Sequence, residues 1–211
     1  MTEIISIDPG NPSSLLIERA VAILRQGGVV AFPTETFYGL AVDATNEKAV
    51  DRIFEIKGRS FNNPIALIIS KDDDLVLITD NITEAAKVLM AAFWPGPLTL
   101  VFKASLSVSP RLTAGTGKIG ARISSHPIAH ALAAGLGRPI TATSANLSGA
   151  RECTTAAAVK DQITSDLVTI IDGGATSGGK GSTILDITSH PPIVLREGSI
   201  SWKMITERKS T

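Results

Sequence analysis

The sequence predicts an α/β protein, and three observations support this fold class. Apolar segments rich in β-branched residues alternate with segments that repeat apolar residues at helical spacing. Hydrophobic residues make up 44% of the 211 residues and charged residues 19%, so the chain can bury a sizeable core. The order of the segments is mixed and does not follow a strict βαβ repeat. We therefore expect a single twisted sheet with parallel and antiparallel strand pairs and with helices packed on it.

Helices are expected where a capping residue precedes an apolar stripe and a glycine follows it. Ser13 or Ser14, Asn46 and Thr83 are such caps, and Gly58 ends the second helical pattern. The expected helices cover residues 14–26, 47–57, 83–92, 127–136 and 155–162.

Strands are expected where short β-branched runs lie between turn residues. They cover residues 28–32, 65–70, 98–103, 119–124, 139–142, 167–172, 183–187 and 193–196. Residues 1–200 are expected to form one domain. Serine and charged residues dominate the C-terminal tail, residues 201–211, which we expect to hold a short helix and a frayed end.

Composition excludes several classes of protein. The single cysteine, Cys153, allows no intrachain disulfide and favours a cytoplasmic protein. No apolar run reaches the ~18 residues of a membrane span, and the first residues do not resemble a signal peptide. The net charge is zero, which does not favour a globally basic nucleic-acid binder. No metal site is predicted, because His126 and His130 lack a third ligand and the acidic run at 72–74 suits a solvated turn.

The charges are unevenly distributed along the chain. Residues 85–151 contain no Asp or Glu, although about six would be expected from the average of the chain. Seven bases lie in the same stretch: Lys87, Lys103, Arg111, Lys118, Arg122, Arg138 and Arg151. Two interpretations remain open, namely chance combined with apolar core strands, or a segment that lines an anion-binding cleft.

Two short polar segments could carry chemistry. Residues 32–40, FPTETFYGL, follow a predicted buried strand, and ligands of open α/β sheets bind at such strand ends. An ordinary turn, in which Thr34 and Thr36 bond to their own backbone, is the alternative. Lys57 and Arg59 flank Gly58 at a helix end, where they could clamp phosphate or only complement the helix dipole.

Two further segments are rich in hydroxyl groups or glycine. Residues 141–149, TATSANLSG, could turn several donors toward phosphate oxygens or could form a polar connection. Residues 174–181 nearly match a phosphate-binding P-loop, but Gly181 stands where the magnesium-binding hydroxyl belongs. The following residues also predict a strand instead of a helix, so we reject the P-loop interpretation and keep a mobile or phosphate-facing loop.

Taken together, these segments resemble the YrdC-like family. The matching pieces occur in one order over about residues 20–198, namely FPTETFYGLA, KGR followed by PIAL, FWPGPLTLVF, ARISSHP, TSANLSG, GSTILD and LREG. The resemblance implies a twisted α/β fold with a positively charged cleft, with which the acid-free segment agrees. The chain ends about a dozen residues after LREG, so we expect the short, single-domain type.

The resemblance also implies an activity. The synthases of this family make threonylcarbamoyl-adenylate from L-threonine, bicarbonate or CO2, and ATP, and they release pyrophosphate. Mg2+ is expected with the ATP. A transferase partner then passes the threonylcarbamoyl group to an adenosine beside the tRNA anticodon, so that protein and tRNA are implied partners.

Site residues follow from the positions of the family motifs. Lys57 and Arg59 are expected to act on the phosphates as catalytic residues. The further ATP-binding residues expected are Lys118, Ser144, Asn146 and Arg196. Arg122 is expected to clamp the threonine carboxylate, with Thr34 and Ser182 bonded to the other polar groups of the amino acid.

Three positions depart from the family pattern, which has proline at 60 and 124 and valine at 37. Here these positions hold Ser60, Ser124 and Phe37. The departures leave open a paralogue that adenylates another carboxylate. A non-catalytic module that binds double-stranded RNA or tRNA is the other alternative.

Overall fold

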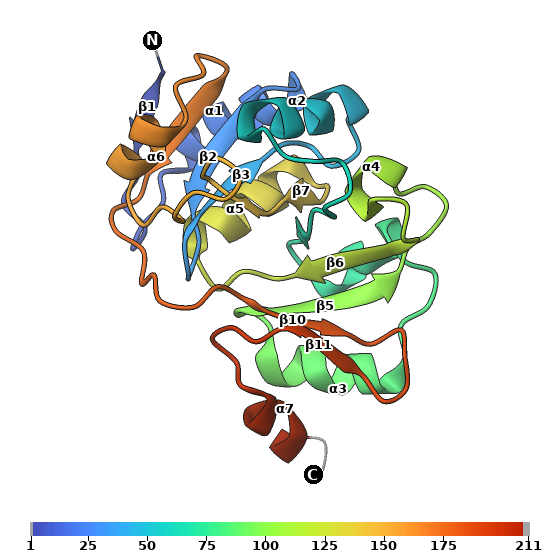
Figure 1. The fold of residues 1–211 in the computed structure, drawn as a ribbon. Coiled ribbons are helices and arrows are strands. Elements are labelled where there is room, and N and C mark those ends of the chain that lie inside the picture. Colours follow the sequence, from blue (N-terminus) through green and yellow to red (C-terminus); the bar gives the residue numbers. More distant parts are fainter. Residues whose placement is uncertain (1, 209–211) are drawn as a thin grey trace.

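The computed structural model describes residues 2–208 and contains two mixed sheets (Figure 1). The strands are β1 (Ile4–Ser6), β2 (Val29–Pro33), β3 (Tyr38–Ala41), β4 (Leu67–Ile68), β5 (Leu98–Lys103), β6 (Lys118–Arg122), β7 (Ile140–Thr141), β8 (Thr143–Ser144), β9 (Val168–Asp172), β10 (Thr183–Asp186) and β11 (Ile193–Arg196). One sheet has the order β1-β9-β2-β3-β8, and the other has the order β11-β10-β5-β6-β4-β7. The α/β class with parallel and antiparallel pairs is confirmed, whereas the expectation of a single sheet is wrong.

The chain changes sheets at Ala142, the last residue of the strand expected at 139–142, and the following residues, expected in a loop, form β8. Ile140 and Thr141 pair with β4 in the second sheet, whereas Thr143 and Ser144 pair with β3 in the first. Apolar patterning identifies strands but does not identify their partners, which explains why two sheets were expected to be one. β3 was missed because residues 32–40 were expected to form a loop or turn, whereas Tyr38–Ala41 are a strand.

The helices are α1 (Ser14–Arg25), α2 (Glu47–Lys57), α3 (Glu84–Phe93), α4 (Pro110–Thr113), α5 (Pro127–Leu136), α6 (Ala156–Gln162) and α7 (Trp202–Arg208), with a 3-10 helix at Asp72–Leu77. Two expected caps are confirmed, because the side chains of Asn46 and Thr83 each accept a hydrogen bond from the backbone N–H three residues later. Ser13 precedes α1 without such a bond. Gly58 ends α2 in the left-handed conformation, at φ 56°.

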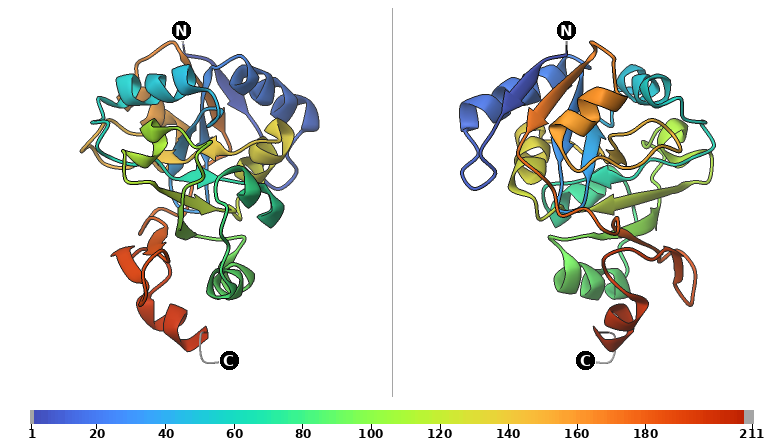
Figure 2. Two further views of the ribbon diagram at one scale, coloured as in Figure 1. Left: turned by 90° about the vertical axis from the view of Figure 1, so that its right-hand side faces the viewer. Right: turned by 60° about the vertical axis from the view of Figure 1, so that its left-hand side comes forward.

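Helices cover both faces of the first sheet (Figure 2). Val30 and Phe32 of β2 lie in one apolar core together with α1 and α5, while Val29 and Ala31 lie in a second core together with α2 and α6. A strand that is buried on both faces reads as a continuous apolar run, which is why β2 was predictable.

The second sheet carries α3 on one side, and α7 packs beside α3 near the C-terminus (Figures 1 and 2). The short C-terminal helix expected from the sequence is confirmed, and its Ile205 is fully buried in the larger core. The frayed end expected at residues 209–211 lies outside the described residues. The division between residues 1–200 and a tail stays a prediction.

Candidate active site

A cleft of about 150 Å³ opens between the two sheets. Residues of the first sheet and its turns that line the cleft include Thr34, Thr36, Phe37, Tyr38, Thr143 and Ser144. Residues of the second sheet and its ends include Thr99, Arg122, Ser182, Ile184 and Arg196, and Arg59 and Glu152 complete the polar wall. The cleft therefore brings together six of the nine predicted site residues, namely Thr34, Arg59, Arg122, Ser144, Ser182 and Arg196.

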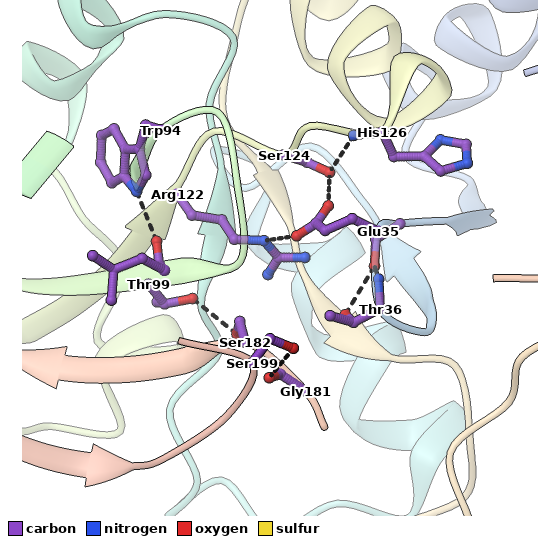
Figure 3. Close-up of polar contacts among 12 residues, drawn as sticks. Glu35, Thr36, Trp94, Thr99, Arg122, Ser124, His126, Gly181, Ser182 and Ser199 are labelled. Carbon is purple, nitrogen blue, oxygen red and sulfur yellow. Dashed lines mark hydrogen bonds and ion pairs between the residues drawn. The ribbon is translucent and has the colours of Figure 1, made fainter. Parts of the chain in front are cut away.

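Arg122 ends β6 and is buried, with its side chain 6% exposed. Its Nε donates a hydrogen bond to Oε1 of Glu35 over 3.1 Å (Figure 3). The Ser124 hydroxyl donates to the other carboxylate oxygen of Glu35. The arginine is thus held on one side by a carboxylate that comes from the turn between β2 and β3.

Arg196 ends the edge strand β11 and reaches over Ser182. Its Nε and Nη2 donate to the Ser182 carbonyl oxygen over 3.0 and 2.8 Å, and Nη2 also reaches the Ser182 hydroxyl. The Thr99 hydroxyl donates to the same serine oxygen over 3.1 Å. Burial lowers the pKa of Arg196 from its usual value, and Glu152 acts in the opposite direction. Both predicted residues, Ser182 and Arg196, therefore lie in one network at the cleft wall.

Arg59 follows the left-handed Gly58, which redirects the chain from α2 toward the cleft. Its Nη2 donates to the Pro64 carbonyl oxygen over 3.0 Å, and Nη1 lies 3.4 Å from the Thr143 hydroxyl. Burial lowers the pKa of Arg59, although a guanidinium stays charged near neutral pH. These contacts orient the guanidinium and leave it on the cleft wall.

Lys57 has a different environment and does not line the cleft. It is 2% exposed, and its ammonium donates to the carbonyl oxygens of Ser144 and Asn146 and to Oδ1 of Asn146. An ammonium has three N–H groups, so all of them serve the loop at residues 144–146. Burial lowers the pKa of Lys57 to about 8, and the nearby Arg59 adds to this shift. The geometry makes Lys57 an anchor of the loop and does not support direct phosphate contact.

Asn146 belongs to the same anchor. Its Oδ1 accepts from Lys57, while its Nδ2 donates to the Ala150 carbonyl oxygen over 2.6 Å. The side chain is therefore occupied on both sides, and it does not line the cleft. Ser144 does line the cleft, so within this loop the structure places one of the two predicted phosphate ligands at the site.

Thr34 lines the cleft from a tight turn. Its hydroxyl donates to the Phe37 carbonyl oxygen over 2.7 Å and accepts from the Thr36 N–H. The expected bonding of a threonine to the backbone of its own turn is thus confirmed for Thr34, whereas the Thr36 hydroxyl bonds the Thr34 hydroxyl, and the same turn presents Thr34 to the cleft. The two interpretations weighed from the sequence are compatible.

The glycine-rich segment at residues 173–181 is fastened to this turn. The Gly178 N–H donates to the Thr36 carbonyl oxygen over 2.8 Å, and the Tyr38 hydroxyl donates to the Gly174 carbonyl oxygen over 2.7 Å. Burial is the largest of the causes that raise the pKa of Tyr38 to about 12. No P-loop helix follows the segment, because β10 begins at Thr183.

Lys118 lies at the other end of β6 from Arg122 and outside the cleft. Its Nζ donates to Oδ2 of the buried Asp186 over 2.8 Å, and the two residues form an ion pair. At about 3.3 Å per residue, the backbone positions of Lys118 and Arg122 are roughly 13 Å apart. The structure thus does not bring Lys118 to the other predicted ligands.

Acidic residues from other parts of the chain pair with several bases of the acid-free segment. Arg122 pairs with Glu35, Lys118 with Asp186, Arg138 with Asp43, and Arg111 with Asp51. A positively charged cleft therefore stays a prediction. Sequence reasoning missed Glu35 as a partner of Arg122, although it is the only acid of the FPTETFYGL motif.

Residues 2–208 lack two kinds of feature. No group of three His, Cys, Asp or Glu side chains there could hold a metal ion. In the same part of the chain, none of the helices has both the length and the apolar character needed to cross a membrane.

A two-sheet α/β fold with three arginines and several hydroxyl groups around one cleft defines a protein suited to bind carboxylates and phosphates. Comparison with known proteins identifies the family. Residues 22–198 match the Sua5/YciO/YrdC family, which is described as "Telomere recombination". The chain belongs to this family.

Individual relatives are similar over most of this chain. Threonylcarbamoyl-AMP synthase from Pyrococcus abyssi is 43% identical over 189 residues, which cover 90% of this chain and 56% of the relative. The Vibrio vulnificus protein of the same name is 36% identical over 184 residues, which cover 86% of this chain and 98% of the relative. The chain spans about half the length of the Pyrococcus abyssi and Bacillus subtilis relatives.

Solved structures agree with this relationship. The crystal structure of Pyrococcus abyssi Sua5 complexed with L-threonine has a TM-score of 0.95 and 40% identity, covering 98% of this chain and 61% of that chain. Escherichia coli YciO has a TM-score of 0.88 and 32% identity, covering 97% of this chain and all of that chain.

Proposed function

We propose that this protein is a threonylcarbamoyl-AMP synthase, which converts L-threonine, bicarbonate or CO2, and ATP into threonylcarbamoyl-adenylate and pyrophosphate. The observation that carries the proposal is the convergence of Arg59, Arg122 and Arg196 on one cleft that also holds hydroxyl donors. Relatives named threonylcarbamoyl-AMP synthase and the L-threonine complex of one of them support the same reaction.

The chemistry requires positioning and charge neutralisation and no protein nucleophile. The threonine amine loses a proton and bonds to the carbon of CO2, which gives a carbamate. A carbamate oxygen then attacks the α-phosphorus of ATP, and the bond to the β-phosphate oxygen breaks as pyrophosphate leaves. Cys153 does not suit a nucleophile, because it is buried and burial raises the pKa of its thiol.

The cleft residues divide between the two substrates. Arg122 suits the threonine carboxylate because a planar guanidinium can bond to both carboxylate oxygens. Thr34 and Ser182, at the ends of β2 and β10, suit the remaining polar groups of the amino acid. On the nucleotide side, Arg59 and Arg196 would neutralise phosphate charge.

The loop at residues 144–146 completes the nucleotide side. Ser144 would donate to a phosphate oxygen, while Lys57 and Asn146 hold the loop in place. Lys118 would reach the phosphates only if the nucleotide extends along β6 beyond the cleft.

Mg2+ would enter with ATP. Among the described residues, the cleft wall carries the carboxylate of Glu152, whereas that of Glu35 is engaged with Arg122 and Ser124. This donor set fits a magnesium ion that keeps phosphate and water ligands and needs no cage of protein carboxylates. The ion would supply further neutralisation of phosphate charge.

The product is a reactive mixed anhydride, so a partner that consumes it is part of the proposal. We expect a transferase that delivers the threonylcarbamoyl group to an adenosine of tRNA, with tRNA itself as a further partner. We place the reaction in the cytoplasm, where a chain with one unpaired, buried cysteine is stable.

Pyrophosphate release tests the proposal. The purified protein is incubated with ATP, Mg2+ and bicarbonate, and each of the twenty amino acids is added in turn. Release with threonine alone, lost in Arg59→Ala and Arg122→Ala, is the expected result. Release with another amino acid would identify a paralogue. Absence of release with all twenty, together with salt-dependent RNA binding, would favour the RNA-binding module instead.

A further inference from the structure

We propose that Glu35 is a positioning residue that aims the Arg122 guanidinium at the substrate carboxylate, with Ser124 as its support. The inference rests on the proposed function, because it assigns Arg122 to the carboxylate of the amino acid. It adds a residue that touches no substrate and acts through its bond to Arg122.

Glu35 is held at both carboxylate oxygens. Its side chain is 13% exposed, and Oε1 accepts from Nε of Arg122 over 3.1 Å while Oε2 accepts from the Ser124 hydroxyl (Figure 3). The Ser124 oxygen in turn accepts from the His126 N–H over 3.2 Å. This chain of contacts joins the turn after β2 to the end of β6 and the start of α5. A carboxylate held at both oxygens cannot rotate freely, so it gives the arginine a fixed direction.

The bond to Glu35 uses Nε of Arg122 and leaves the terminal nitrogens Nη1 and Nη2 available for a ligand. Arginine has five N–H groups, of which the Nε–H is engaged with Glu35. Among residues 2–208, neither Nη1 nor Nη2 of Arg122 donates a hydrogen bond. In Figure 3 the guanidinium lies between Glu35 and Ser182, and Arg122 lines the cleft. The two terminal nitrogens therefore form the free fork that a bidentate carboxylate contact requires.

Ser124 supplies the support of the second oxygen of Glu35. Here the serine is 1% exposed and supplies the second bond to Glu35. A buried hydroxyl that donates to this largely enclosed carboxylate fixes the orientation of Glu35 as well as its charge.

A purely structural role for Glu35 makes different predictions from a positioning role. If the carboxylate only tied the turn to β6, its loss would weaken stability and would affect both substrates alike. If it aims Arg122, its loss acts on the amino acid that Arg122 binds and leaves ATP unaffected. The discriminating quantity is therefore the KM for threonine relative to the KM for ATP.

The kinetic test compares Glu35→Ala, Glu35→Gln and Ser124→Ala. We expect Glu35→Ala to raise the KM for threonine about tenfold, with the KM for ATP changed less than about twofold. Glu35→Gln retains an acceptor for the Arg122 Nε–H, so it should recover much of this loss. Ser124→Ala should raise the KM for threonine about threefold, because one of the two bonds to Glu35 remains.

Asp43→Asn is the matched control. Asp43 is a buried carboxylate that, like Glu35, accepts from an arginine, Arg138 over 3.0 Å, and from a hydroxyl, that of Thr45 over 2.6 Å. Asp43 does not line the cleft, so the KM of Asp43→Asn for threonine should equal that of the wild type. An equal rise of both KM values in Glu35→Ala, or the same effect in Asp43→Asn, would overturn the proposal.

A threonine derivative isolates the carboxylate contact. L-threonine amide lacks the carboxylate, so wild type and Glu35→Ala should bind it equally weakly in calorimetry, whereas L-threonine should distinguish them. A preference for threonine that persists unchanged in Glu35→Ala would contradict the assigned role.

A spectroscopic test needs no substrate and separates this inference from the proposed function. The Arg122 Nε–H signal in ¹H–¹⁵N spectra, assigned by its absence in Arg122→Lys, should exchange slowly with water in the wild type. It should shift and exchange faster in Glu35→Ala, while backbone signals confirm the fold. An unchanged Nε–H signal in Glu35→Ala would refute the positioning role of Glu35, even if the protein uses threonine. Failure of the wild type to bind threonine would refute the proposed function. The Nε–H signal would then still show whether Glu35 is bonded to Arg122.

Discussion

Lys57 and Arg59 stand two residues apart, yet the fold gives them opposite environments. Lys57 ends α2 inside the protein and donates all three N–H groups to oxygens of the loop at residues 144–146. Arg59 follows the left-handed Gly58 and emerges on the cleft wall. The same short motif thus contributes one cation to the fold and one to the site.

A cation of the Lys57–Arg59 segment is therefore not a phosphate ligand merely because of its position in the chain. The number of N–H groups left without a protein acceptor decides between the two roles. By this criterion Arg59, Arg122 and Arg196 are candidates for ligand contact, whereas Lys57 is a structural anchor of the loop that carries Ser144.

The largest effect on stability is expected from substitution of Lys57, the anchor of the loop. Lys57→Met leaves three buried oxygens of the loop without a donor and should lower the free energy of unfolding by about 3 kcal/mol. Pyrophosphate release should be lost as well, because the loop carries Ser144. Urea denaturation measures the stability, with the exposed Lys48→Met on the same helix as a control. A loss below about 1 kcal/mol would show that Lys57 is not an anchor.

The next largest effect, on the rate of pyrophosphate release, is expected from substitution of Arg59 at the cleft. Arg59→Ala should reduce the rate of pyrophosphate release about 100-fold, because a charge-assisted contact to the leaving phosphates is removed. The free energy of unfolding should change by less than about 1 kcal/mol, since Arg59 is partly solvated at the cleft. Steady-state kinetics and urea denaturation of the same sample test both parts. If Arg59→Ala destabilises the protein as strongly as Lys57→Met, the contrast between the two cations disappears.

A smaller effect concerns pH. Folding lowers the pKa of Lys57 from 10.5 to about 8, so between these pH values the unfolded chain binds more protons at this residue than the folded chain. Its contribution to stability therefore rises with pH, by up to ~1.4 kcal/mol per pH unit, and it is lost as pH falls through 8. The measurement is the difference in unfolding free energy between wild type and Lys57→Met at pH 7.5 and 9. A difference that stays constant would refute the shifted pKa.

The smallest effect is expected at Lys118. Its ammonium is paired with Asp186 and is partly exposed, so Lys118→Met should cost less than about 1 kcal/mol of stability. The KM for ATP should rise less than about threefold, because Lys118 lies outside the cleft. A tenfold rise would instead support the phosphate contact expected from the sequence and would extend the nucleotide site along β6.

Much of the fold could be predicted because local chemistry encodes it. Asn46 and Thr83 cap their helices as expected, and β2 is a buried strand because both of its faces meet apolar cores. Two sheets were mistaken for one because Ala142 lies between strands that belong to different sheets. Pairing partners depend on tertiary contacts that apolar patterning does not record.

Site residues could be predicted where the residue type and motif position suit one ligand. They could not be predicted where burial by a distant segment determines the role of the side chain. Arg122 and Arg196 follow motif positions and line the cleft. The burial of Lys57 depends on a loop almost 90 residues later in the chain, which accepts its N–H groups. The pairing of Glu35 with Arg122 likewise spans 87 residues, and no local pattern encodes such a contact.

Detection of threonylcarbamoyl-adenylate itself tests the proposed reaction. The protein is incubated with ATP, Mg2+, L-threonine and ¹³C-bicarbonate, and the mixture is analysed at once by mass spectrometry. Threonylcarbamoyl-adenylate that is heavier by one mass unit than the product from unlabelled bicarbonate is the predicted result. Formation of pyrophosphate with an unlabelled aminoacyl-adenylate, or no adenylate at all, would contradict the proposed reaction.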